Sequence, residues 1–320
     1  MSQLRVYRGI EQIPPDFGPS ALTIGNFDGV HVGHRFLMRQ TAQLAAEGGW
    51  KASVLTFDPH PAYIVAPSKA PRLMTAIARR CELMQEDGIE QVLVLPFTPE
   101  IARLTPEQFV EDLLVRRLGV KAVVVGEDFR FAAGQKGTAA LLQSLGERLG
   151  FRVQLIESIL VRGERVSSSQ VRRHVELGEV GRAARLLSRP YSLEGAVVPG
   201  EGIGHRQTVP TLNLAPDSEV LPASGVYVTC TRDLETGRKW QSITNVGFRP
   251  TFNGQSLTIE TFLLSALDPP SPRHIRVNFL WRVRDERKFD SPEALKAQIL
   301  QDVARASAYF RHRDALVRVR

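Results

Sequence analysis

The fold is decided by the stretch Gly25-Asn26-Phe27-Asp28-Gly29-Val30-His31-Val32-Gly33-His34. An apolar run before it, Ala21–Ile24, predicts a strand, and the amphipathic segment His34–Glu47 predicts a helix. A loop that joins a strand to a helix start offers free backbone N–H groups and the positive end of the helix dipole, and both favour phosphate. The sequence therefore predicts a phosphate-binding turn at the start of the first large helix.

The alternation of strands and helices continues beyond this turn. Further strands are predicted at Ala52–Phe57, Gln91–Pro96, Ala122–Val125 and Arg152–Ile156, and further helices at Thr75–Glu86, Thr105 to about Arg117, and Thr138–Leu149. Strands and helices in this order indicate a doubly wound parallel sheet with helices on both faces. Ligands bind at the carboxyl ends of the strands in such sheets.

After two short helices that end near Arg189-Pro190, the composition changes to Gly/Pro punctuation between short β-type runs. These runs, Gly225–Thr229, Trp240–Asn245, Thr258–Leu264 and Ile275–Trp281, predict a small antiparallel β-barrel. Ser291-Pro292-Glu293 predicts the start of a C-terminal helix. We therefore expect two domains, residues 1–188 and 189–320.

Composition excludes several classes of protein. The net charge of +7 is spread over both halves, so nucleic-acid binding is not expected. Binding of anionic small molecules is a simpler explanation of the excess positive charge. The two cysteines are far apart, and no apolar signal core or membrane-length run occurs. We expect a cytoplasmic protein that does not associate with a membrane and has no obligate protein partner.

The paired histidines of the first turn carry the strongest chemical signal. His31 and His34 flank Gly33, and two imidazole N–H groups donating to a triphosphate would stabilise charge on a leaving pyrophosphate. The same pattern could instead cap the helix or bind a metal, although no carboxylate cluster accompanies it. The strand–loop–helix context favours nucleotide binding.

Three further segments are candidates for the same sheet edge. Thr56–Pro61 and Gly126–Phe131 follow predicted strands, although either could be turn chemistry alone. Arg165 to Arg172 brackets three hydroxyls, Ser167, Ser168 and Ser169, at a helix start. That arrangement suits a phosphate clamp, or else an N-cap between two surface arginines.

The second half contains weaker motifs. Gly200, Gly202 and Gly204 form a glycine-rich loop that could cradle phosphate or be a plain β-turn. Thr211 and Asn213, in Pro-Thr-X-Asn, offer hard oxygens that suit Mg²⁺ but could also belong to an ordinary turn. Glu260 could take a proton from a substrate hydroxyl, or lie on a solvated strand face.

Taken in order, these motifs resemble bacterial bifunctional riboflavin kinase/FMN adenylyltransferases over nearly the whole chain. The resemblance implies an N-terminal nucleotidyltransferase domain of the His-X-Gly-His type and a riboflavin kinase barrel that use ATP, Mg²⁺, riboflavin, FMN and FAD. For adenylyl transfer it implies His31 and His34 as catalytic residues and ATP contacts from Gly25, Asn26, Phe27, Asp28, Gly33, Asp128, Arg165, Ser168, Ser169 and Arg172. For the kinase it implies Glu260 as base, Gly200, Gly202, Gly204, Thr211 and Asn213 on Mg²⁺-ATP, and Arg249 and Arg287 on flavin.

The chain departs from the family pattern in places. Ser169 replaces a usual Thr, and Gln207-Thr208-Val209 stands where Leu-Gly-Phe is usual, after His205 in place of Arg. Phe262 replaces a histidine two residues after the base, and Asp268–Pro272 replaces an Asp-Leu-Tyr-Gly loop. The alternative is therefore an FMN adenylyltransferase with a degenerate, flavin-binding kinase module. A transferase for another phosphate ester and a non-enzymatic, flavin-responsive or nucleic-acid-binding regulator are more distant alternatives.

Overall fold

A computed structural model describes residues 3–199, 211–251 and 254–318. The chain divides into two compact units, Met1–Ser168 and Ser169–Arg320. This division groups the two short helices after Ser167 with the barrel. The sequence-based boundary at residue 188 assigns them to the first domain, and that boundary stays a prediction.

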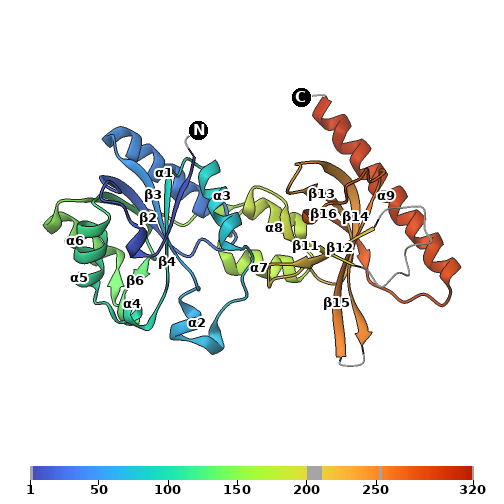
Figure 1. Cartoon of the computed structure of the whole chain (residues 1–320), viewed down its shortest axis with the longest axis horizontal. Coiled ribbons are helices and arrows are strands. Elements are labelled where there is room, and N and C mark those ends of the chain that lie inside the picture. Colours follow the sequence, from blue (N-terminus) through green and yellow to red (C-terminus); the bar gives the residue numbers. More distant parts are fainter. Residues whose placement is uncertain (1–2, 200–210, 252–253, 319–320) are drawn as a thin grey trace. The chain divides into compact units, whose positions relative to one another are not determined.

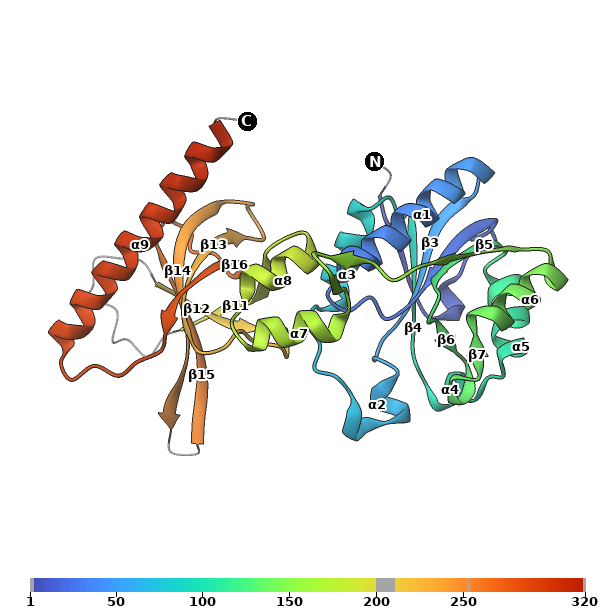
Figure 2. The same ribbon diagram turned by 180° about the vertical axis from the view of Figure 1, so that it is seen from behind.

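The first unit contains a six-stranded parallel sheet (Figures 1 and 2). Its strands, in spatial order, are β1 (Arg5–Arg8), β4 (Gln91–Leu95), β3 (Lys51–Phe57), β2 (Ser20–Ile24), β5 (Val120–Gly126) and β8 (Arg152–Ile156). The chain moves outward from β2 through β3 to β4 and then returns to the other side of β2 with β5. This reversal opens a crevice at the carboxyl ends of β2 and β5, where ligands bind in open α/β sheets.

Helices cover both faces of this sheet, as the doubly wound prediction requires. One face packs against α1 (Val32–Gly48) and α3 (Ile77–Glu86), and the other against η3 (Phe109–Arg117) and α6 (Ala139–Leu149). The remaining short elements are η1 (Ile10–Gln12), α2 (Ala62–Val65), η2 (Pro67–Lys69), α4 (Pro99–Arg103), α5 (Pro106–Gln108), β6 (Arg130–Phe131), η4 (Ala133–Gln135), β7 (Gly137–Thr138), β9 (Leu160–Val161) and β10 (Glu164–Arg165).

Thr105 begins a helix as predicted. Its hydroxyl accepts the Gln108 N–H at 3.2 Å, and the Gln108 side chain accepts the Thr105 N–H at 3.0 Å, which completes a capping box. The helix then widens into the π-helical turns of η3, which the sequence did not indicate.

The second unit contains a closed six-stranded antiparallel barrel, which confirms the predicted architecture. Its strands, in spatial order, are β11 (Tyr191–Val198), β12 (Thr211–Pro216), β15 (Gly254–Leu263), β14 (Lys239–Thr251), β13 (Gly225–Asp233) and β16 (His274–Asp285). The helices of this unit are α7 (Ser168–Glu176), α8 (Val180–Leu187) and α9 (Pro292–Arg318). The Ser291 hydroxyl accepts the Ala294 N–H at 3.2 Å, so Ser291 caps α9 as predicted.

The helix α9 packs on the outer wall of the barrel. Ala306 and Phe310 of α9 join Val226, Val228 and Ile243 in one buried cluster. The opposite faces of these strands and of β15 point into the barrel. There, hydrogen bonds of 2.8–3.0 Å join a chain of buried hydroxyls: Thr229, Thr231, Ser242, Thr244 and Thr261.

Candidate active sites

The first site is built where β2 passes into α1. His31 occupies the N-cap position of α1 with extended backbone, and the backbone N–H of His34 donates to its Nδ1 at 3.3 Å. Because Nδ1 is the acceptor, a neutral His31 ring carries its proton on Nε2. The His31 and His34 rings stack with centroids 3.6 Å apart, so the two imidazoles present their edges as a pair.

The backbone of this loop is held in an uncommon conformation. Phe27 and Val30 have positive φ angles, 51° and 41°, although neither is glycine. The Phe27 ring meets the His34 ring edge-on at 5.1 Å. A side chain at Gly33 would bring its Cβ within 3.2 Å of the His31 ring, so Gly33 makes room for the histidine itself.

A cavity of about 290 Å³ lies over this loop. Eight residues expected at the ATP site line it together: Gly25, Phe27, His31, Gly33, His34, Asp128, Arg165 and Ser168. They come from the carboxyl ends of β2 and β5, from the start of α1, and from the segment that leads into α7. The histidine pair and the Arg165–Ser168 segment thus share one cavity.

Two contacts hold the Arg165–Ser168 segment against the rest of the site. An exposed ion pair of 2.7 Å joins Arg165 to Asp128. The Ser168 hydroxyl donates to the backbone carbonyl of Asp28 at 2.9 Å. Ser169 and Arg172 follow in α7 and belong to the second unit.

Asn26 and Asp28 shape the loop and do not line the cavity. The Asn26 amide lies 2.9 Å from Nε2 of His60. The buried Asp28 carboxylate accepts the backbone N–H groups of Met74 and Thr75 at 3.1 Å. His60 belongs to the Thr56–Pro61 segment, which therefore reaches the loop as predicted.

The second site lies on the outer wall of the barrel. Register pairs Asn213 with Glu260 and Glu260 with Asn245, so these polar side chains form a row across β12, β15 and β14. The next row on the same face, two residues along, is Thr211, Phe262 and Ile243. Thr211 and Asn213 lie on strand β12, so they do not belong to the ordinary turn that the sequence allowed as an alternative.

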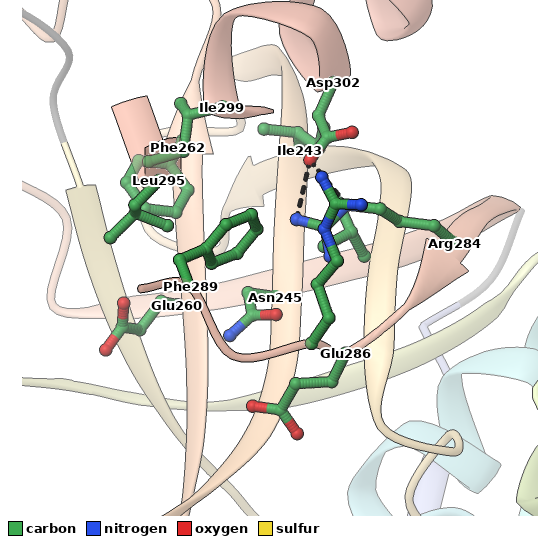
Figure 3. A pocket seen from close by; sticks show the side chains of 12 residues that line it. Ile243, Asn245, Glu260, Phe262, Arg284, Glu286, Phe289, Leu295, Ile299 and Asp302 are labelled. Carbon is green, nitrogen blue, oxygen red and sulfur yellow. Dashed lines mark hydrogen bonds and ion pairs between the residues drawn. The ribbon is translucent and has the colours of Figure 1, made fainter. Parts of the chain in front are cut away.

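A cavity of about 310 Å³ opens beside this row and under α9 (Figure 3). Glu260, Asn245 and Glu286 supply carboxylate and amide groups at one end. The rest of the wall is mainly apolar, and it is formed by Val226, Ile243, Phe262, Phe289, Leu295 and Ile299, with Arg284, Arg287 and Asp302. This combination suits a planar apolar ligand with a polar tail.

A buried polar network holds α9 over this cavity. Asp302 accepts hydrogen bonds from Arg284 Nε at 2.9 Å and from Gln298 Nε2 at 2.8 Å, and Arg284 Nη2 lies 2.8 Å from the same carboxylate as an ion pair. Arg287 donates to Gln298 and lies over the Phe289 ring, 4.8 Å from its centroid. The predicted flavin residue Arg287 thus lines the cavity.

Some predicted site residues fall outside the part of the chain that the structure describes. Gly200, Gly202 and Gly204 lie outside the described residues, as does the side chain of Arg249. Asn245 and Glu286 were given no role from the sequence, because their place in the site depends on strand register and not on local spacing.

Two further properties of the described residues bear on function. They contain no group of three or more His, Cys, Asp or Glu side chains suited to a metal ion. In the same part of the chain, no helix has the length and apolar character needed to cross a membrane.

Comparison with known proteins agrees with this geometry. The family model for FAD synthetase matches residues 13–170, and that for riboflavin kinase matches residues 187–310. The chain is 36% identical to the bifunctional riboflavin kinase/FMN adenylyltransferase of Escherichia coli K12, covering 96% of this chain and 98% of the relative. It is 34% identical to the protein of that name from Pseudomonas fluorescens, covering 95% and 97%.

A solved structure has the same fold along nearly its whole length. It is a Streptococcus pneumoniae protein described as a macrolide-efflux protein, with a TM-score of 0.82 and 26% identity, covering 93% of this chain and 97% of the other. The two family matches, together with 36% sequence identity over nearly the full length, place this chain in the family of bifunctional riboflavin kinase/FMN adenylyltransferases.

Proposed function

We propose that this chain phosphorylates riboflavin to FMN in its barrel and adenylylates FMN to FAD in its parallel-sheet unit, with ATP in both steps. The observation that carries the proposal is the presence of two separate cavities, one built on His31 and His34 and the other on Glu260. Each cavity offers side chains suited to one of the two reactions, which supports the proposal.

In adenylyl transfer, a phosphate oxygen of FMN attacks the α-phosphorus of ATP and pyrophosphate leaves. Nε2–H of His31 donates to the phosphate oxygens on which negative charge grows, and His34 acts beside it. Arg165 and Ser168 supply further donors from the same cavity, with Ser169 and Arg172 following in α7. Arg165 reaches phosphate by exchanging its exposed contact with Asp128, which costs little because such surface pairs are weak.

In the kinase reaction, Glu260 takes the proton of the terminal ribityl hydroxyl as its oxygen attacks the γ-phosphorus of ATP. The apolar wall of Phe262, Phe289 and Leu295 receives the flavin ring, with Arg287 beside it. Arg249 is proposed as a second flavin contact, and Gly200, Gly202 and Gly204 as the phosphate loop.

Thr211 and Asn213 suit Mg²⁺ because both are oxygen donors on one strand face, with Asn213 paired to Glu260. A magnesium ion prefers few protein oxygens together with phosphate oxygens, which fits a site without a carboxylate cluster. When bound, Mg²⁺ neutralises charge on the transferred phosphate.

The test is to separate the two activities by mutation. His31→Ala should lower FAD formation from FMN and ATP by about 10²–10³-fold, with riboflavin phosphorylation unchanged. Glu260→Ala should lower FMN formation by about 10²–10⁴-fold while FAD still forms from supplied FMN. Glu235→Ala, an exposed carboxylate at a barrel turn, is the control.

Failure of the wild-type protein to convert riboflavin would support the adenylyltransferase-only alternative. Equal loss of both activities in each variant would contradict the division into two sites.

A further inference from the structure

Arg80 of α3 is a buried cation that neither the motifs nor the proposed mechanism uses. Only 2% of its surface is exposed, and its Nη1 donates to the backbone carbonyl of Asn26 at 2.7 Å. Within the described part of the chain its Nε has no hydrogen-bond partner. Burial lowers the pKa of its guanidinium, whereas the carboxylates of Asp28 and Asp58 raise it. Arginine nevertheless stays protonated in proteins, so a fixed positive charge lies against the loop.

The loop is anchored from two directions at Asn26 and Asp28. The Asn26 carbonyl also accepts from the Thr56 hydroxyl at 3.3 Å, and its amide meets His60. Asp28 accepts the Met74 and Thr75 N–H groups immediately before α3. Arg80 and the segment that precedes α3 therefore hold the two residues that flank Phe27.

Phe27 is the residue that needs this support. Its left-handed backbone is unfavourable for a bulky side chain and persists only where the surroundings fix it. In that conformation its ring meets the edge of His34. A chain of contacts thus runs from Arg80 through the Asn26 carbonyl and Phe27 to His34.

We infer that Arg80 is a positioning residue for adenylyl transfer, which it serves by fixing the Asn26 carbonyl and thereby the place of the His34 ring. The inference rests on the proposed function of this site. Arg80 itself does not line the cavity, so it acts through the loop.

The test is Arg80→Lys, which keeps a buried cation but loses the guanidinium geometry. The kcat for FAD formation from FMN and ATP should fall about 10- to 100-fold, the effect of losing a hydrogen bond to a charged group. The KM for ATP should change by less than about threefold, because the loss falls mainly on the transition state. Arg79→Lys, a change on the same helix at a residue paired with Glu82 and Glu86, should leave kcat within about twofold.

A double-mutant cycle with His34→Ala separates positioning from general destabilisation. If Arg80 acts through His34, Arg80→Lys should change the residual pyrophosphate release of His34→Ala by less than about twofold. A full multiplicative loss in that background would overturn the inference, as would wild-type kcat in Arg80→Lys alone. Riboflavin phosphorylation by the same samples reports the intact barrel. Absence of FAD formation by the wild-type protein would instead refute the proposed function.

Discussion

Replacing Asp302 by alanine should undock α9 from the barrel. Asp302 is 3% exposed, accepts one hydrogen bond from Arg284 and one from Gln298, and forms a second ion-pair contact with Arg284. Removing one partner of a buried ion pair costs about 3–5 kcal/mol, because the other charge is left uncompensated. The Arg284 side chain keeps 17% exposure and can recruit some water, so we expect a loss near the lower limit, about 3 kcal/mol.

Urea unfolding followed by tryptophan fluorescence measures this loss. Trp281 of β16 lies parallel to Tyr309 of α9, with ring centroids 6.2 Å apart, so its emission reports docking of the helix. With an m-value of about 2 kcal/mol/M, the transition should move about 1.5 M lower in urea. Riboflavin phosphorylation should fall with it, because α9 supplies Leu295, Ile299 and Asp302 to the cavity, whereas FMN adenylylation should persist.

The double variant Arg284→Met/Asp302→Leu tests the electrostatic explanation. Replacing both charges by apolar groups of similar volume removes the uncompensated cation, so most of the lost stability should return. Kinase activity should stay low, since Arg284 also lines the cavity. A shift below about 0.5 M in Asp302→Ala, or a double variant as unstable as the single one, would refute the reasoning.

Two other predictions concern single residues, Gly33 in the first unit and Tyr227 in the barrel. Gly33→Ala should lower FAD formation about three- to tenfold without affecting FMN formation. The new Cβ would lie 3.2 Å from the His31 ring and displace that ring by a few tenths of an ångström. Unchanged FAD synthesis would show that the ring has room to move. Burial raises the pKa of Tyr227 to about 12 from 10.0, so the neutral phenol stabilises the fold fully below pH 10 and this stability is lost as pH rises toward 12. Tyr227→Phe should remove that part of the pH dependence, as measured by urea midpoints between pH 9 and about 12; an identical alkaline decline in both proteins would place its cause elsewhere.

Most of the fold could be predicted because its strands are apolar and lie between clear helix signals. The strands β2 to β5 are almost wholly buried and match the apolar runs to within one or two residues. In contrast, β1 was missed because Arg5–Arg8 is a largely exposed edge strand with two arginines. The first two barrel strands, β11 and β12, were also missed, since Glu194 and Asn213 interrupt their apolar pattern and the register that explains them is set by partners far along the chain.

The loop of His31 and His34 could be predicted because its residues are contiguous and contact one another. Each of His31, Gly33 and His34 contacts another member of the same ten-residue stretch. The role of Arg80 could not be predicted in the same way. An arginine on an amphipathic helix is normally a surface residue, and only the packing of α3 against the loop turns it inward.

Strand register also explains why Phe262 is compatible with a working kinase. Because Phe262 lies two residues from Glu260 on the same strand face, it belongs to the row of Thr211 and Ile243 and not to the row of Glu260. Its ring packs on the apolar cluster beneath α9, beside Leu295 and Ile299 (Figure 3). A histidine there would place a polar ring on an apolar wall, at a cost in desolvation, whereas phenylalanine packs against that wall without burying a polar atom. The departure at Asp268–Pro272 falls between β15 and β16, and none of its residues lines the cavity. Both departures therefore leave in place the polar row of Asn213, Glu260 and Asn245, on which the proposed riboflavin phosphorylation depends.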